Sequence, residues 1–256
     1  MIITKDLSVR FHQTEVLSNV TFRAEPGQLV SIAGPNGSGK TTLLRALTSE
    51  IDYHGEIRFD GENLTDLSHQ TLAKRRAILP QATQLAFPFT VLEVVQMAEQ
   101  DRRSERPLQA LQRVGLKGFE SRFYQELSGG EKQRVQLARV LVQVWQPMID
   151  GKANWLLLDE PVASLDIGHQ IEVMQLARDY ANAGGGVICV MHDLNLAAMF
   201  SDSIALFEKR RLLIQASPVA VLTDDNLSTA YQWPVRVNRT PNESMPFVLP
   251  QTANSD

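Results

Sequence analysis

The sequence of 256 residues has only one cysteine, Cys189, so no disulfide can form within the chain, which fits a reducing compartment. It has no apolar run near the roughly 18 to 20 residues that a membrane-spanning helix needs. Charged residues interrupt the apolar stretch at residues 1–10, which is unlike a signal peptide. The formal net charge of −4 gives no basic field, which argues against a general nucleic-acid-binding protein. We therefore expect a soluble protein, in which any membrane role depends on a partner.

The remaining composition, with 43% hydrophobic and 21% charged residues, is that of a folded protein with a substantial core. Short apolar or alternating runs predict strands at residues 7–9, 16–22, 29–33, 54–61, 155–158 and 187–191. Helical patterns occur at residues 40–51, 91–99, 107–114, 131–144, 170–181 and 194–200. Strands that alternate with helices predict an α/β fold with a parallel sheet, and the strand-poor middle predicts a helical insertion. The proline-containing end of the chain is expected to be loosely held.

A glycine-rich segment between a predicted strand and a predicted helix matches the pattern G-x-x-x-x-G-K-[ST] in full. Its residues, with the one that follows, are Gly34, Pro35, Asn36, Gly37, Ser38, Gly39, Lys40, Thr41 and Thr42. Glycines allow backbone N–H groups to surround phosphate oxygens, and a helix N-terminus adds a partial positive charge. Lys40 is expected to contact the β- and γ-phosphates of ATP, and the Thr41 hydroxyl to bind Mg²⁺. The alternative, a glycine-rich turn that happens to contain a lysine, does not explain why both flanking elements are also present.

An apolar run, Trp155-Leu156-Leu157-Leu158, ends in two carboxylates, Asp159 and Glu160. In a fold of this kind the ligand binds at the carboxyl ends of the strands, so these side chains are expected beside the phosphate loop. Asp159 is expected to hold Mg²⁺, through water, and Glu160 to polarise the attacking water as the general base. The pair on its own could equally be a polar strand exit; together with the phosphate loop it predicts hydrolysis.

A third segment, Leu127-Ser128-Gly129-Gly130-Glu131, precedes a helical pattern and lies upstream of the acidic pair. It resembles the signature sequence of the ABC ATPases, and the other motifs of that family occur in the expected order. Phe11 stands where the family has an aromatic ring that stacks on adenine, and Gln81 where a glutamine contacts Mg²⁺ and water. Ser164-Leu165-Asp166 resembles the D-loop, and His192 the switch histidine that senses the γ-phosphate. Each short element alone has an ordinary structural explanation, but the ordered set is specific.

The resemblance covers about residues 1 to 220 and implies a single ABC ATPase domain. Residues 1–82 and 150–235 would form the P-loop core with an N-terminal antiparallel β subdomain, residues 83–149 the helical subdomain and residues 236–256 a tail. In this family Ser128, Gly129 and Gly130 would bind the γ-phosphate held by the other subunit, and Asp166 would join the nucleotide-binding residues. A homodimer that pairs head to tail is therefore implied, with ATP at both interfaces.

The family also implies partners: two transmembrane permease subunits and, indirectly, a periplasmic substrate-binding protein. The chain would then lie on the cytoplasmic face of a bacterial inner membrane, which it would reach only through the permease. The sequence departs from the family at Val162 and Ala163, where threonine and serine are common, and at Phe11, where tyrosine is. Phe11 keeps the stacking ring, so neither departure affects the expected chemistry.

Two features are similar to particular importers. The segment after Gln81, which includes Ala82, Thr83 and Gln84 and the run Phe87-Pro88-Phe89-Thr90-Val91, resembles ATPases of iron-siderophore, cobalamin and haem importers. The long connection at residues 144–154 is similar to haemin-import ATPases, although loop lengths also drift freely. Haem is therefore the first expectation for the cargo, with a ferric siderophore or cobalamin as the alternative.

Three other functional classes share part of this pattern. ABC proteins of translation or DNA repair usually have two cassettes or a long coiled coil, and this sequence has neither. A P-loop kinase would share the phosphate loop without the signature or the switch histidine. A regulatory ATPase that binds a soluble partner would differ from a transport ATPase only in what it binds.

Overall fold

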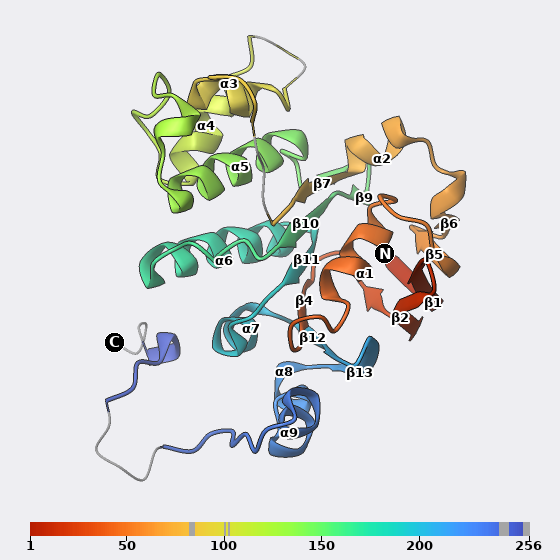
Figure 1. Cartoon of the computed structure of the whole chain (residues 1–256). Helices are drawn as coiled ribbons and strands as arrows, with labels where there is room; N and C mark the ends of the chain where they lie inside the picture. Colours follow the sequence, from red (N-terminus) through yellow and green to blue (C-terminus); the bar gives the residue numbers. More distant parts are fainter. Residues whose placement is uncertain (82–84, 100, 102, 241–245, 253–256) are drawn as a thin grey trace.

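The computed structural model of the chain describes residues 1–81, 85–99, 101, 103–240 and 246–252. A six-stranded sheet runs through it (Figure 1), in the order β13 (Arg211–Ala216), β12 (Ser203–Glu208), β4 (Leu29–Ala33), β11 (Gly186–Val190), β10 (Trp155–Asp159) and β7 (Arg76–Leu79). Its pairings are parallel except the one between β12 and β13. Every residue of β4, β10 and β11 is buried, which explains their continuously apolar sequences. The predicted α/β fold with a mainly parallel core sheet is confirmed.

A second, antiparallel sheet is built mainly from the first 60 residues. Its strands are, in order, β2 (Thr14–Val20), β1 (Ile2–Phe11), β5 (His54–Phe59) and β6 (Glu62–Asn63), and β3 (Arg23–Ala24) also pairs with β1. Side chains that alternate between buried and exposed along β1 and β5 are typical of a sheet with one covered face. This confirms the N-terminal antiparallel sheet that the family resemblance implied.

Helix α1 (Lys40–Leu47) packs between the two sheets, and its leucines Leu43, Leu44 and Leu47 join a core with Phe59 and Trp155. Helices α6 (Ile167–Asn182) and α7 (Leu194–Phe200) contribute to the core on the other side of the parallel sheet (Figure 1). Other short elements are η1 (Leu64–Asp66), α2 (His69–Arg75), α8 (Pro218–Val221) and α9 (Asp224–Tyr231). Because helices cover both faces, the loops at the carboxyl ends of the strands are the open part of the sheet.

Three helices inserted between β7 and β10 pack on one another: α3 (Val91–Gln96), α4 (Arg106–Arg113) and α5 (Gly129–Gln143), with η2 (Tyr124–Glu126) before α5. They form a separate group at one end of the molecule (Figure 1). Capping boxes fix the start of α3, at Thr90 and Glu93, and of α5, at Ser128 and Glu131. The predicted first boundary of this insert falls at residues 82–84, which lie outside the described residues.

Two segments differ from the sequence-based expectation. The connection at residues 144–154 contains a small hairpin of β8 (Met148–Ile149) and β9 (Lys152–Ala153), turned at Asp150 and Gly151 with φ of 51° and 73°. The start of the tail is held rather than loose. Asp224 accepts hydrogen bonds from the Val237 N–H at 2.8 Å and the Arg236 guanidinium at 2.9 Å, and η3 (Pro250–Thr252) lies against α7.

Among the residues the structure describes, none of the helices combines the length and the apolar character that crossing a membrane would require.

Candidate active site

The phosphate loop connects β4 to α1, as the sequence predicted. Gly34, Gly37 and Gly39 have φ of 139°, 75° and 103°, a region that side chains other than glycine rarely adopt. A Cβ added to Gly34 would lie 2.4 Å from the Phe207 carbonyl oxygen, so β12 lies directly behind the loop. The buried hydroxyl of Ser38 has no hydrogen-bond partner within the described part of the chain. A glycine-rich loop at a helix N-terminus with an unused hydroxyl fits a bound phosphate.

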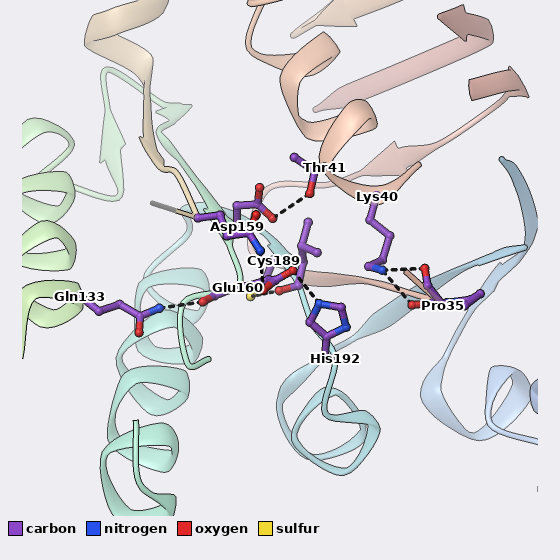
Figure 2. A network of polar contacts seen from close by, with 11 residues as sticks. Pro35, Lys40, Thr41, Gln133, Asp159, Glu160, Cys189 and His192 are labelled. Atoms are coloured by element: carbon purple, nitrogen blue, oxygen red, sulfur yellow. Dashed lines mark hydrogen bonds and ion pairs between the residues drawn. The ribbon is translucent and has the colours of Figure 1, made fainter. Parts of the chain in front are cut away.

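Lys40 is buried at the first position of α1, and its ammonium group lies inside the loop. Its Nζ donates hydrogen bonds to the carbonyl oxygens of Gly34 at 2.8 Å and Pro35 at 2.9 Å (Figure 2). Burial lowers the pKa of Lys40, while the charges of Glu160 and Asp159 act in the opposite direction. The loop therefore holds a positively charged group. A phosphate oxygen can take the place of the two carbonyl oxygens as its hydrogen-bond acceptor.

Asp159 ends β10 and is almost fully buried, 4% exposed, opposite the start of α1. The Thr41 hydroxyl donates a hydrogen bond to its Oδ1 at 3.3 Å (Figure 2). Burial raises the pKa of Asp159; the charge of Glu160 adds to this effect, and the Thr41 hydrogen bond opposes it. A hydroxyl and a carboxylate that already face each other are the hard oxygen ligands that Mg²⁺ prefers, so these residues fit that ion.

Glu160 is held at the end of β10 in a left-handed backbone conformation, with φ of 53°. Its Oε1 lies 2.6 Å from His192 Nε2, and its Oε2 accepts a hydrogen bond from Gln81 Nε2 at 3.0 Å. Its backbone N–H donates to the Val190 carbonyl at 3.2 Å, on the neighbouring strand β11. A strained glutamate whose carboxylate is oriented by two side chains is typical of a catalytic position. The structure thus brings together three residues that the sequence predicted as catalytic.

Lys40, Thr41, Gln81, Glu160 and His192 line one pocket of about 490 Å³. Its lining comprises Val16, Asn36, Gly37, Gly39, Lys40, Thr41, Thr42, Gln81, Glu160, His192 and Arg210. Phe11, at the end of β1, is 42% exposed and does not line this pocket itself, but its hairpin does, through Val16. The size suits a nucleotide, since small-molecule sites usually measure roughly 300 to 1,000 Å³.

The other group of predicted residues lies away from the phosphate loop. Ser128 caps α5, and a Cβ added to Gly130 would lie 3.0 Å from the carbonyl oxygen of Ser164. Asp166 caps α6 and also contacts the His169 ring at 2.8 Å. Gly129 and Gly130 therefore face the D-loop segment of the same chain, and neither Ser128 nor Asp166 lines the phosphate pocket.

A family model described as "ABC transporter" matches residues 17–163. The chain belongs to the ABC transporter family. Hemin import ATP-binding proteins are similar along the whole length: that of Jannaschia sp. is 54% identical over 99% of this chain and 95% of the relative, and that of Roseobacter denitrificans 51% over 97% of each. A third, from Rhizobium meliloti, is 46% identical over 99% of both chains.

Solved ABC ATPases share the fold. A dimeric ATP-binding cassette in a post-hydrolysis state with ADP and Pi is 26% identical, with a TM-score of 0.73 over 85% of this chain and 99% of that one. A bacterial Atm1-family ABC exporter with ATP bound gives a TM-score of 0.77 at 26% identity, over 86% of this chain and 39% of that chain.

Two residues of this ABC ATPase were missed by sequence reasoning. Gln133 donates a hydrogen bond from Nε2 to the Glu160 carbonyl at 2.7 Å (Figure 2) and accepts one at Oε1 from the Ser164 N–H at 3.3 Å. Arg210 lines the phosphate pocket although it lies 170 residues after Lys40. No local pattern marks either residue, since one is an ordinary helix position and the other a turn position.

Proposed function

We propose that this chain is the ATP-binding and ATP-hydrolysing subunit of a bacterial haem importer. The observation that carries the proposal is the identity of 46% to 54%, over nearly the whole length, with hemin import ATP-binding proteins. An intact phosphate loop and an oriented Glu160 support the hydrolytic part, because a chain that had lost the activity would have no reason to keep them.

In the proposed reaction, ATP enters the pocket with its β- and γ-phosphates at Lys40, whose two carbonyl contacts are exchanged for phosphate oxygens. Thr41, Asp159 and Gln81 would hold Mg²⁺, which supplies charge neutralisation at the phosphates. Glu160 takes a proton from the attacking water as it adds to the γ-phosphorus, and the β–γ bond breaks to release ADP and phosphate. Gln81 and His192 hold the Glu160 carboxylate in place for that step.

The active unit would be a homodimer. One chain carries one phosphate loop, and its Ser128, Gly129 and Gly130 lie outside that pocket, so they are available to a second chain. The dimeric ATP-binding cassette of similar fold supports this arrangement. Head-to-tail pairing would place Ser128 at the γ-phosphate bound by the partner subunit, and ATP would hold the dimer closed until hydrolysis releases it.

Two transmembrane permease subunits would bind the dimer on the cytoplasmic face of the inner membrane, with a periplasmic binding protein delivering the cargo on the other side. The exposed Phe87 and the half-buried Phe89 precede α3 and offer an aromatic surface for the permease. No contact between this chain and haem is required, since the cargo passes through the permease.

The test is ATP-driven uptake of hemin into inverted or reconstituted vesicles that contain this chain and its permease. Uptake that requires ATP and disappears with Glu160→Gln would establish both the enzyme and the cargo. A matched control is Glu172→Gln, which removes an exposed carboxylate from α6 and should leave uptake unchanged. ATP hydrolysis without hemin uptake would support the ATPase assignment but contradict haem as the cargo. A ferric siderophore or cobalamin would then be tested as the cargo in the same vesicles.

A further inference from the structure

The turn between β12 and β13 lies over the phosphate loop and carries two consecutive basic residues, Lys209 and Arg210. Both have left-handed backbone conformations, with φ of 44° and 71°. Such conformations are unfavourable for long side chains and are usually filled by glycine or asparagine in hairpin turns. Backbone preference therefore does not explain why Lys209 and Arg210 occupy this turn, and a role of their side chains would explain it.

Several contacts fix Arg210 against the elements that build the nucleotide pocket. Its carbonyl oxygen accepts a hydrogen bond from the Ser18 N–H at 2.8 Å, and its Nη1 donates one to the Glu15 carbonyl at 2.7 Å. A Cβ added to Gly39 would lie 3.9 Å from the Arg210 Cα, and closer still to Leu17 and Val16, so the turn and β2 both lie beside the phosphate loop. Further along, the Gln215 side chain accepts a hydrogen bond from the Arg23 N–H and donates one to the Arg23 carbonyl oxygen. These two bonds hold β13 against β3. The guanidinium group is thus positioned by the β1–β2 hairpin on one side and the loop on the other.

Arg210 lines the same 490 Å³ pocket as Lys40 and Glu160. Glu160 and His192 follow β10 and β11, and their proposed roles are at the γ-phosphate. Arg210 instead reaches Glu15, the residue that pairs with Arg10 directly before Phe11. It therefore lies between the phosphate loop and the hairpin that carries the expected adenine ring contact.

The charge of Arg210 is available to a ligand. Its hydrogen bond goes to a neutral carbonyl, and in the described part of the chain no carboxylate lies within ion-pair distance of it; Lys209, by contrast, pairs with Glu208 at 2.9 Å. A guanidinium group that is pre-positioned in a phosphate pocket and lacks a counter-charge is suited to bind a phosphate oxygen.

We propose that Arg210 is a nucleotide-binding residue that contacts the α-phosphate of the bound nucleotide. It complements Lys40, which serves the β- and γ-phosphates, so the triphosphate is held by one cation at each end. This inference rests on the proposed function, since it concerns the same pocket. Because ATP and ADP share the α-phosphate, Arg210 contributes to the binding of both, and it takes no part in the cleavage of the β–γ bond.

The experiment measures the Kd of MgATP and MgADP by calorimetry for the full chain, its Arg210→Gln variant and the control Lys209→Gln, which removes the other charge of the same turn. With Arg210→Gln we expect the Kd of both nucleotides to rise by a similar factor, roughly 10- to 150-fold, the size of one charge-assisted hydrogen bond. Lys209→Gln should change either Kd by less than about twofold.

Two further variants separate charge, planarity and backbone effects. Arg210→Lys keeps the charge and should retain part of the affinity. Full affinity in Arg210→Gln together with a loss in Arg210→Lys would instead indicate that a planar group stacks on the base, and would overturn the α-phosphate contact. Arg210→Gly relieves the left-handed backbone, so it should lose affinity while its thermal stability is maintained or increased. Unchanged affinity in Arg210→Gly and Arg210→Gln, or a loss for MgATP alone, would refute the proposal. If the unmodified chain bound neither nucleotide, the proposed function itself would fail.

Discussion

Replacing Glu160 by glutamine is the most selective perturbation that this site allows. The side chain keeps its size, and both of its present contacts can be kept. The amide oxygen can accept the hydrogen bond from Gln81 that is now 3.0 Å long, and the amide NH₂ can donate to a neutral His192 across the present 2.6 Å contact. What disappears is a negatively charged oxygen that can accept a proton from water.

The magnitude follows from that single loss. General-base catalysis contributes a rate factor of about 10² to 10⁴, which corresponds to roughly 2.7 to 5.5 kcal/mol in the activation free energy. ATP binding should be equal or tighter, because a negative charge is removed from beside a triphosphate and the orienting contacts remain. We therefore expect kcat to fall by at least about 100-fold while the Kd for MgATP does not increase.

The assay is phosphate release by the purified chain under saturating MgATP, with equilibrium binding measured on the same preparation and Glu172→Gln as the control. Size-exclusion chromatography with ATP should also show a lasting dimer for Glu160→Gln, since ATP is bound but not cleaved. A kcat within twofold of the unmodified chain would refute the general-base role of Glu160. A large increase in Kd would instead show that its carboxylate serves binding.

Other predictions concern residues around this centre. Gly34→Ala should destabilise the chain by a few kcal/mol more than Gly37→Ala, because only at the former does an added Cβ meet backbone, at 2.4 Å; thermal unfolding of both variants compares them. Gln133→Ala should lower kcat about 5- to 10-fold with little change in Kd for MgATP, as one or two modest hydrogen bonds are lost near the general base; steady-state kinetics would reveal the opposite pattern if the residue served binding. Ser128→Arg on one subunit of a mixed dimer should disable the opposite site only, and full activity of both sites would contradict pairing in trans. Asp224→Ala should expose the start of the tail to faster trypsin cleavage without slowing hydrolysis, whereas equal cleavage rates would show that these contacts do not hold it.

The sequence could predict those parts of the site in which the functional residues and the local structural pattern lie in the same short stretch of the chain. The phosphate loop requires glycine at strained positions between a strand and a helix, and Asp159 and Glu160 directly follow a buried strand, so pattern and function coincide. Gln133 and Arg210 are placed by contacts with residues far away in the chain, Glu160 in one case and Glu15 in the other. Such contacts depend on how the elements pack, which no local pattern records. The β8–β9 hairpin was missed for a different reason: two strands of two residues are too short to show a period.

The position of Gln133 gives the proposed dimer a physical route between its two sites. Helix α5 begins at Ser128, the residue expected to meet the nucleotide of the partner subunit, and Gln133 lies little more than one turn further along the same rigid helix. From there Gln133 binds the Glu160 carbonyl at 2.7 Å and the Ser164 N–H at 3.3 Å. A shift of α5 on closure around the partner's ATP must therefore be passed to the backbone that positions Glu160, or break these bonds. In the proposed dimer, each chain would thus couple the nucleotide that it contacts in trans to the nucleotide that it cleaves in cis.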